Sequence, residues 1–529
     1  MFCRVWSMVI HGVEAVPVRV EADVSDGMPM FTIVGYVSAQ VREAQDRVRT
    51  ALRNLGIVLP PKRIVINLAP ANIRKDGPRF DLPIAAAVLL AIGRIPPRSL
   101  ENTMLIGELG LNGDVQAVTG VLSSVLEARK IGIRSCILPS ANLPEGKQAE
   151  LEETWGISSL KELLAYCCGE RPEEGSRQQG LHGTAEAAEE EQKTAGLAQA
   201  GLSEYGDFDE ILGQEGVKRA ALIAASGFHN LLLFGPPGSG KSMAARRIPT
   251  ILPPMTRAEQ LEVTRLYSIA GLLPSGQSLI WNRPFRAPHH SITAQALVGG
   301  GRYPSPGEIT LAHRGVLFLD ELPEMSRRVL ELLRQPLEEH QILISRQEGT
   351  YLFPSSFVLV AAMNPCPCGY YPDRERCHCS ETDIARYLGT LSQAFLDRMD
   401  LCTEVPAVSY ETLAPEDGKR RAERSSSARM RQIVARAREV QLDRYRESGQ
   451  QFNSELKPGQ IGKFCPLTPE ASRMLEQAYT ALRLSARGYH RILKVARTIA
   501  DMEPCETINT THVGEALCCR SLDKKIWRV

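Results

Sequence analysis

Residues 230–242 read NLLLFGPPGSGKS, an apolar stretch that runs directly into a glycine-rich loop. The loop matches the pattern G-x-x-x-x-G-K-[ST] in full, and the residues after it, MAARRI, are typical of a helix. A strand, such a loop and a helix in this order form a P-loop, whose backbone N–H groups cradle phosphates. We therefore predict a nucleotide site formed by Gly235, Pro236, Pro237, Gly238, Ser239, Gly240, Lys241 and Ser242.

A second motif lies about 80 residues downstream, where residues 316–321 read VLFLDE. An apolar strand that ends in two carboxylates suits ATP hydrolysis: one acid joins the Mg²⁺ shell and the other activates the attacking water. We assign these roles to Asp320 and Glu321. Lys241 is predicted to hold the β- and γ-phosphates, and Ser242 to ligate Mg²⁺ with Asp320.

The surrounding pattern sets the fold class. Residues 209–406 alternate helices with apolar strands (230–234, 315–319 and 357–361), which indicates an α/β core with a parallel sheet. Residues 407–529 are helical in pattern and predict a lid and C-terminal domain. Residues 1–168 mix strands and helices, among them an apolar helix at 81–92 that must be buried.

Residues 169–210 differ from both neighbours in composition. They hold eleven acidic and three basic residues and few large apolar side chains, too little apolar surface to offset the entropy of ordering. We predict a flexible acidic linker at 169–208, with a solvated helix at 184–200 as the alternative.

Composition excludes several classes of protein. The net charge of the 529-residue chain is +1, so overall charge indicates no nucleic-acid partner. No apolar run approaches the roughly 20 residues that span a bilayer, and the first residues lack a signal-peptide pattern. Thirteen scattered cysteines argue against a disulfide framework. A cytoplasmic protein with reduced thiols and no membrane partner is expected.

Four of those cysteines form the pattern C-P-C-x₈-C-x-C, namely Cys366, Cys368, Cys377 and Cys379. Two closely spaced thiol pairs suit a tetrahedral Zn²⁺ site, and four protein ligands leave no open position, so the zinc is expected to be structural. The spacing is tighter than the usual C-x₂-C. His378 as a replacement ligand, two redox disulfides and inert thiols remain alternatives.

Several longer segments resemble the ComM/YifB-type magnesium-chelatase-like AAA+ ATPases. They read HNLLLFGPPGSGKSM (229–243), RPFRAPHHSITAQALVGGG (283–301), GEITLAHRGVLFLDELPEM (307–325), AAMNPCPCG (361–369) and SARGYHRILKVARTIADM (485–502). The likeness covers the chain apart from the linker. It implies a homo-oligomeric, hexameric, ATP-dependent ring that acts on DNA, with branch migration during recombination of incoming DNA in natural transformation as the best-known activity.

The resemblance also implies roles for residues that spacing leaves ambiguous. Asn364 matches the sensor-1 position, which reads the γ-phosphate, and residues 211–214 match the segment beside the adenine. Arg398 looks like the arginine finger that reaches a neighbouring subunit's site. Arg487 looks like the sensor-2 arginine of the lid, with Arg491 as the competitor. An arginine supplied in trans means that assembly completes the site.

The N-terminal region resembles the domain shared by Lon-type proteases and a DNA-repair ATPase, through KDGPRFDLP (75–83) and residues 106–133. In Lon-type proteases the nucleophilic serine follows Gly-Pro, and here that place is Arg79. Without a hydroxyl there is no nucleophile for a Ser-Lys dyad, so a non-proteolytic domain is expected. A DNA-contacting role and a purely oligomer-supporting role both remain open.

Three segments are candidates for DNA contact. Residues 341–353 predict a β-hairpin with a turn at Glu348-Gly349, and 284–302 form a second insertion; in the wider class such insertions project into the ring's channel. Residues 419–438 hold eight basic residues against one acid, which suits phosphate contacts or a solvated helix face equally. No aromatic stacking platform is evident, so single-stranded or branched DNA bound without sequence specificity is the expected partner.

The predicted activity is therefore ATP hydrolysis by an AAA+ motor of the helicase or translocase type. A chelatase motor subunit and a protein-remodelling ATPase are the alternatives, since they share the AAA+ core.

Overall fold

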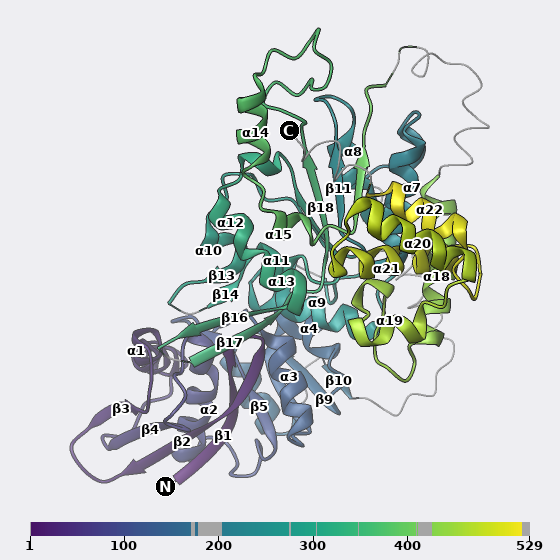
Figure 1. The fold of residues 1–529 in the computed structure, drawn as a ribbon. Coiled ribbons are helices and arrows are strands. Elements are labelled where there is room, and N and C mark those ends of the chain that lie inside the picture. Colours follow the sequence, from purple (N-terminus) through teal and green to yellow (C-terminus); the bar gives the residue numbers. More distant parts are fainter. Residues whose placement is uncertain are drawn as a thin grey trace.

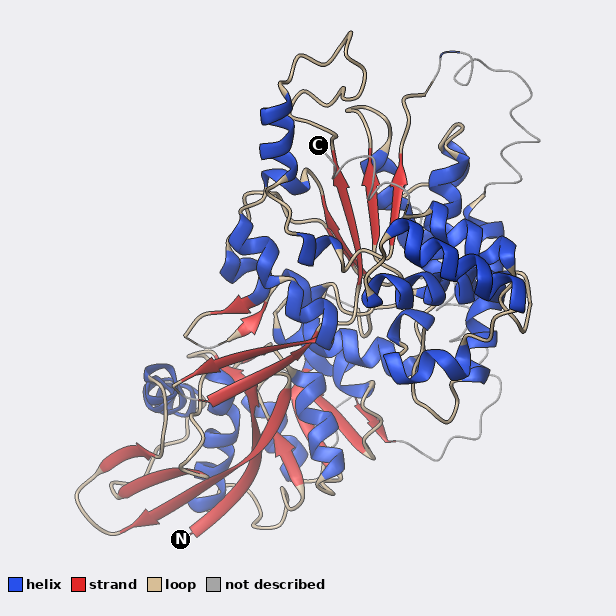
Figure 2. Ribbon diagram, in the orientation of Figure 1, coloured by secondary structure: helices blue, strands red, loops and turns tan. Residues whose placement is uncertain are grey.

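The computed structural model describes residues 2–170, 175–177, 204–274, 277–302, 304–347, 349–408, 410 and 426–520 of the chain. The N-terminal region, purple to blue in Figure 1, lies below the AAA+ core in that view, and the C-terminal helices cover one side of the core. Figure 2 shows a sheet in each of the first two parts and an all-helical third part. The predicted α/β fold with a helical lid is confirmed.

The N-terminal region is built on an eight-stranded mixed sheet of order β10-β9-β8-β5-β1-β2-β4-β3. Its strands are β1 (Phe2–His11), β2 (Glu14–Ser25), β3 (Met30–Val34), β4 (Arg63–Ala69), β5 (Thr103–Leu105), β8 (Ser135–Pro139), β9 (Glu153–Ile157) and β10 (Gly175–Arg177). Its helices are α1 (Ala39–Asn54), α2 (Asp81–Ala91), α3 (Val121–Lys130), α4 (Leu143–Lys147) and α5 (Leu160–Cys167), with a small hairpin of β6 (Glu108–Leu109) and β7 (Val115–Gln116).

Helix α2 is buried along its whole length, as its unbroken apolar sequence predicts, and it packs between the sheet and α1. Strand β10 lies inside the range predicted as linker and pairs antiparallel with β9. At the other end of that range, Phe208 is fully buried in the core of the AAA+ part. The alternative helix at 184–200 lies outside the described residues.

The AAA+ core has a five-stranded sheet of order β12-β15-β18-β11-β19, and every pairing is parallel. The strands are β12 (Phe285–Arg286), β15 (Val316–Leu319), β18 (Val358–Met363), β11 (Leu231–Phe234) and β19 (Leu401–Glu404). Because all strands run the same way, their carboxyl ends meet at one edge of the sheet (the carboxyl edge) and their amino ends at the other (the amino edge).

Helices and two small hairpins surround this sheet. The helices are α7 (Glu215–Gly227), α8 (Lys241–Arg247), α9 (Arg257–Ile269), α10 (Ala294–Val298), α11 (Glu308–Leu311), α12 (Arg327–Leu332), α13 (Arg334–Glu339), α14 (Glu381–Leu388) and α15 (Gln393–Leu396). One hairpin pairs β13 (Gly299–Gly300) with β14 (Ser305–Pro306). The predicted hairpin before Asn364 is confirmed as β16 (Gln341–Arg346) and β17 (Gly349–Pro354); Glu348, in its predicted turn, lies outside the described residues.

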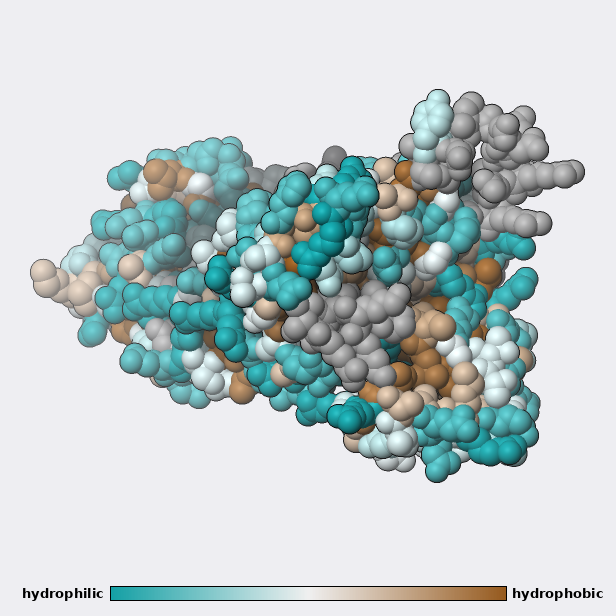
Figure 3. All heavy atoms as spheres, turned by 45° about the horizontal axis from the view of Figure 1, so that its top comes forward, coloured by the Kyte–Doolittle hydropathy of each residue, from teal (hydrophilic) through white to brown (hydrophobic). Residues whose placement is uncertain are grey.

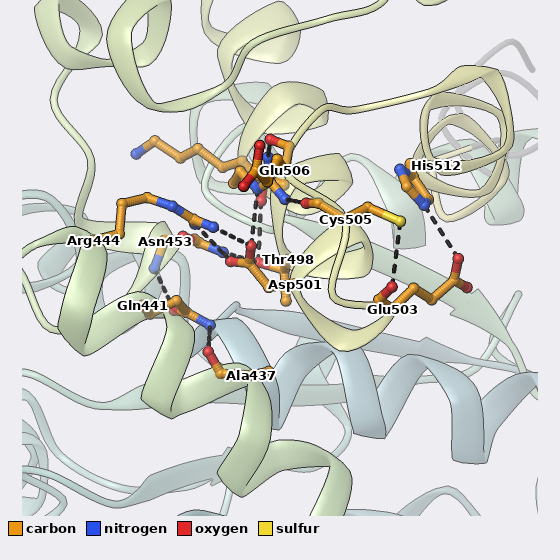
Figure 4. A network of polar contacts seen from close by, with 12 residues as sticks. Ala437, Gln441, Arg444, Asn453, Thr498, Asp501, Glu503, Cys505, Glu506 and His512 are labelled. Carbon is orange, nitrogen blue, oxygen red and sulfur yellow. Dashed lines mark hydrogen bonds and ion pairs between the residues drawn. The ribbon is translucent and has the colours of Figure 1, made fainter.

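The C-terminal part consists of α18 (Ser427–Arg444), α19 (Pro458–Phe464), α20 (Pro469–Leu482), α21 (Ala486–Met502) and α22 (Thr510–Cys518). A buried polar network holds it together (Figure 4), centred on the carboxylate of Asp501. Arg444, Arg497 and Asn453 each donate to that carboxylate. Since a buried carboxylate is costly unless it is paired, these three donors fix the relative positions of α18, α21 and the turn between α18 and α19.

One face of the molecule can be judged from its side-chain hydropathy. Hydrophilic side chains predominate on the face drawn in Figure 3, with small hydrophobic patches between them. Within the part of the chain that the structure describes, no helix combines the length and the apolar character that crossing a bilayer requires.

Candidate functional site

The P-loop connects β11 at the carboxyl edge to α8. Gly238 and Gly240 have φ values of +74° and +93°, a backbone region that favours glycine. A Cβ on Gly235 would overlap with the carbonyl oxygen of Val405. The backbone conformation or the close packing of the loop therefore requires glycine at all three positions. The resulting tight turn presents backbone N–H groups to a phosphate.

Lys241 points back into this loop. Its Nζ donates to the carbonyl oxygens of Gly235 (2.7 Å) and Pro236 (2.8 Å) and to Oδ1 of Asn364 (3.0 Å). Desolvation lowers the pKa of Lys241, and the charge of Asp320 opposes that shift. The structure therefore brings together the predicted lysine and the predicted sensor-1 asparagine, which lie 123 positions apart in the sequence.

Asp320 follows β15 and lies beside the start of α8. Oγ of Ser242 donates to its Oδ2 at 2.6 Å. A carboxylate and a hydroxyl at this distance are the oxygen ligands that Mg²⁺ accepts while it keeps several waters, so the pair fits the metal that the P-loop pattern implies.

Glu321 has the left-handed backbone conformation (φ +50°), and its N–H donates to Oδ1 of Asp320 (2.9 Å). Its side chain is 54% exposed, and Oε2 lies 3.0 Å from Nδ1 of His290. His290 was not predicted as a site residue from the sequence, although it lies in the insertion 284–302. The two adjacent histidines in RAPHH could have indicated a site. That one of them lies beside Glu321, however, depends on the fold.

The predicted arginines lie at the opposite, amino edge. Arg398 is buried and pairs with Glu338 at 2.5 Å, while Arg487 approaches the same carboxylate oxygen at 3.7 Å. Arg491 lies 3.5 Å from Asp400. All three arginines line a cavity of about 530 Å³ between the core and the lid.

The strand β11 separates this cavity from the P-loop of the same chain. Asn230, just before β11, donates from its side chain to the carbonyl oxygen of Arg398 (3.0 Å), whereas Phe234 at the other end precedes the P-loop. Four residues at about 3.3 Å each span roughly 13 Å. The structure does not place Arg398, Arg487 or Arg491 beside Lys241.

The four predicted zinc ligands come together in one cluster. Their Sγ atoms all lie within 4.8 Å of one another, and Cys366 lies 3.3 Å from Cys368 and 3.7 Å from Cys377. A disulfide needs about 2.05 Å, and tetrahedral zinc with Zn–S bonds of about 2.3 Å places sulfurs roughly 3.8 Å apart. The four thiols are free and fit a zinc ion. His378 is exposed and outside the cluster.

In the N-terminal region, Arg79, which the resemblance to Lon-type proteases sets at the position of the nucleophile, is buried. It donates to the carbonyl oxygen of Thr119 and lies 3.4 Å from Oγ of Ser124. Desolvation lowers the pKa of Arg79 to about 10, although the negative charge of Glu145 acts in the opposite direction. The guanidinium is thus held by protein groups beside a cavity of about 500 Å³, which also meets the β16–β17 hairpin at Tyr351.

That hairpin contacts the N-terminal region and one of the other candidate DNA segments, the insertion 284–302. The Tyr351 ring stacks on His11 with centroids 4.4 Å apart. Arg346 donates to the carbonyl oxygen of Gly301, so the hairpin and the insertion 284–302 touch. Leu343 and Leu352 are cross-strand partners and half exposed.

The basic stretch 419–438 is described only from residue 426 onward, where it forms part of α18. Arg429 and Arg436 are exposed, whereas Arg438 is buried, lies over the Phe452 ring at 3.8 Å and donates to Gln451. Burial lowers the pKa of Arg438 to about 10. Of the two alternatives left open for this stretch, phosphate contact and a solvated face, neither applies to Arg438, because helical periodicity turns it toward the core.

Comparison with known proteins places these features in a family. Three family models match: "Subunit ChlI of Mg-chelatase" over residues 20–142, "Magnesium chelatase, subunit ChlI" over 207–413 and "Magnesium chelatase, subunit ChlI C-terminal" over 424–520. The chain is 41% identical to the competence protein ComM of Haemophilus influenzae over 520 residues, 98% of this chain and 97% of that protein.

Two further relatives are similar over different lengths. YifB of Salmonella typhimurium is 40% identical over 513 residues, 97% of this chain and 96% of that protein. The Lon protease of Roseiflexus castenholzii is 30% identical over 142 residues, 26% of this chain and 17% of the protease. This last likeness agrees with the Lon-like character of the N-terminal region.

Proposed function

This chain belongs to the ComM/YifB-type, magnesium-chelatase-like AAA+ family, and on that premise we propose that it is an ATP-driven motor that acts on DNA. The observation that carries the proposal is the division of the ATPase residues between the two edges of one sheet. Lys241, Ser242 and Asp320 lie together at the carboxyl edge, and Arg398 lies at the amino edge. A ring in which each amino edge meets the next subunit's P-loop would complete every site.

At the carboxyl edge we assign one role to each residue. The P-loop binds the phosphates of ATP, with Lys241 on the β- and γ-phosphates, and Ser242 and Asp320 hold Mg²⁺, which neutralises phosphate charge. Glu321 accepts the proton of the attacking water, and Asn364 positions that water against the γ-phosphate. Lys241 already donates to Asn364, and Asp320 already accepts hydrogen bonds from Ser242 Oγ and from the N–H of Glu321.

At the amino edge, Arg398 supplies the arginine finger to a neighbouring subunit and Arg487 approaches from the lid. Both guanidinium groups lie near the same Glu338 oxygen. In a single subunit, this carboxylate therefore orients both side chains before a neighbouring subunit binds. A homo-oligomeric ring, hexameric by resemblance to the family, follows from this assignment.

The DNA part of the proposal is supported by the relative named as a competence protein and by the exposed hairpin before Asn364. We propose branch migration or helicase-like movement on single-stranded or branched DNA, without sequence specificity. The organisation proposed with it is a non-proteolytic Lon-like domain (1–168), a linker (169–208), the AAA+ core (209–406) and a helical lid (407–529), with a structural zinc at the cysteine cluster.

ATP turnover measured with single-stranded, duplex and branched DNA at low salt tests this proposal. We expect DNA to raise the rate, and the rise to fade steeply with salt because phosphate contacts release counterions. If no form of DNA changes the rate, the motor assignment fails. Stimulation by a porphyrin-binding partner would instead favour a chelatase role, which the family models' names suggest, and stimulation by unfolded protein a remodelling role.

A further inference from the structure

The cysteine cluster lies on a loop that touches the P-loop directly. Gly369, between the two cysteine pairs, has φ +86°, and a Cβ there would overlap with Cδ of Pro237 and lie 3.0 Å from its Cγ. The same glycine donates its N–H to the carbonyl oxygen of Cys366 (2.9 Å) and lies 3.2 Å from the Cys366 sulfur. One residue therefore connects the sulfur cluster to the loop that binds phosphates.

A second connection runs through the chain itself. Asn364, which accepts a hydrogen bond from Nζ of Lys241, precedes Cys366 by two residues. The cluster thus adjoins the P-loop on one side through Gly369 and Pro237, and on the other through Asn364 and Lys241. A change in its geometry reaches the phosphate-binding residues over a few bonds.

The loop has no regular secondary structure, and it is held by core packing and by local polar contacts. Residues 364–380, all of them described, contain no helix or strand. Between the cysteine pairs, Asp373 donates to the carbonyl oxygen of Tyr370 (2.9 Å) and Cys377 donates to that of Asp373 (2.8 Å). Free thiols are weak hydrogen-bond partners, whereas four thiolate–metal bonds would fix all four attachment points at once.

We propose that this cluster is a nucleotide-linked metal site, in which a thiolate-bound metal of the zinc class and ATP at the P-loop stabilise each other's binding. The metal orders the loop, the loop holds Pro237 and Asn364 in place, and the P-loop is thereby shaped for phosphate. Linkage is reciprocal, so ATP must tighten metal binding by the factor by which metal tightens ATP binding. The inference rests on the P-loop part of the proposed function and not on DNA.

The first test compares the full-length chain with Cys366→Ser/Cys377→Ser. Zinc per chain is measured by elemental analysis after purification without chelator, and the Kd for a fluorescent non-hydrolysable ATP analogue is measured by titration. We expect the variant to lose the metal and to bind the analogue about tenfold more weakly, within the usual range of coupling between two sites. Equal nucleotide affinity with and without metal overturns the proposal, as does wild-type protein that neither retains nor takes up Zn²⁺.

The reciprocal measurement uses wild-type protein alone, so it stands even if the cysteine variant does not fold. Zinc affinity is measured by competition with a chromophoric chelator, with and without the ATP analogue. We expect the analogue to raise zinc affinity by the same factor, about tenfold. If the ATP analogue does not change zinc affinity, the linkage is contradicted. This result does not depend on whether DNA stimulates ATP turnover.

Gly369→Ala tests the contact between Gly369 and Pro237 without removing any of the four cysteine ligands. The new methyl group meets Pro237, so zinc content should stay near that of wild type while nucleotide affinity falls severalfold. The matched control is Gly449→Ala, which has a similar φ (+78°) but nothing within 4 Å of the added Cβ. Equal nucleotide binding by the two variants refutes the Gly369–Pro237 route.

Discussion

The two edges of the AAA+ sheet hold different sets of the predicted ATPase residues. The carboxyl edge gathers the P-loop, Asp320, Glu321 and Asn364, and its polar groups already bond to one another. The amino edge gathers arginines around a cavity of about 530 Å³, with Glu338 and Asp400 as their partners. The carboxyl edge holds the phosphate-binding loop, and the arginines lie at the edge away from it. If the proposed roles hold, neither edge forms a complete ATPase site in a single subunit.

The largest effect is expected for Arg398, which in the proposed ring joins the two edges across subunits. Arg398→Ala should lower ATP turnover by about 10³-fold, the low end for loss of an arginine finger, while ATP binding survives because the P-loop is untouched. Steady-state hydrolysis and analogue titration measure the two quantities.

Mixing that variant with Lys241→Ala sharpens the comparison further. An interface between an intact P-loop and an intact finger forms again in mixed rings, so part of the turnover should return. Mixed rings that co-assemble by size-exclusion chromatography yet stay inactive would rule out action in trans.

Glu321→Gln tests the carboxyl edge by itself. It removes the carboxylate proposed to activate water but leaves Asp320 and Ser242 in place, so ATP binding should persist while turnover falls at least ~10²-fold. Turnover near the wild-type rate would show that Glu321 is not the base.

His290→Ala tests whether the insertion 284–302, through His290, limits the activity of Glu321. Removing the partner 3.0 Å from Glu321 should raise turnover without DNA by roughly two- to fivefold, the scale of a partly exposed ion pair, and reduce the stimulation by DNA accordingly. His289→Ala is the matched control, since His289 lies 2.8 Å from Ser291 Oγ instead. If both variants turn over ATP at the same rate without DNA, His290 does not limit Glu321.

The smallest effect is expected on α18, away from both edges. Arg429→Gln/Arg436→Gln should reduce the magnitude of the negative slope of log affinity for duplex DNA against log salt by about 1.8, if each arginine contacts one phosphate. Arg446→Gln/Arg473→Gln makes the same charge change at other exposed positions and should leave the slope unchanged. An unchanged slope in the first variant means that α18 is only solvated.

Much of the fold was predictable because its signals are local. The P-loop strand, the VLFLDE strand and the buried helix near residue 81 each depend on a short run of apolar residues, and the structure has them as β11, β15 and α2. Short or edge elements were missed, such as β12 with two residues and β19 with four. Their apolar runs are too brief to be distinguished from loops, and parallel pairing with a distant strand stabilises them.

What the sequence by itself determined is the kind of chemistry: a phosphate-binding loop, two carboxylates after a strand, four clustered thiols, and a family in which these occur together. Only the tertiary structure decided which groups meet. It placed Arg398 and Arg487 against Glu338, at the edge away from their own P-loop, set His290 beside Glu321, turned Arg438 inward and laid Gly369 on Pro237. A local pattern specifies a residue's own backbone and side chain, whereas its partner across the fold depends on strand order and helix packing, which no short stretch of sequence contains.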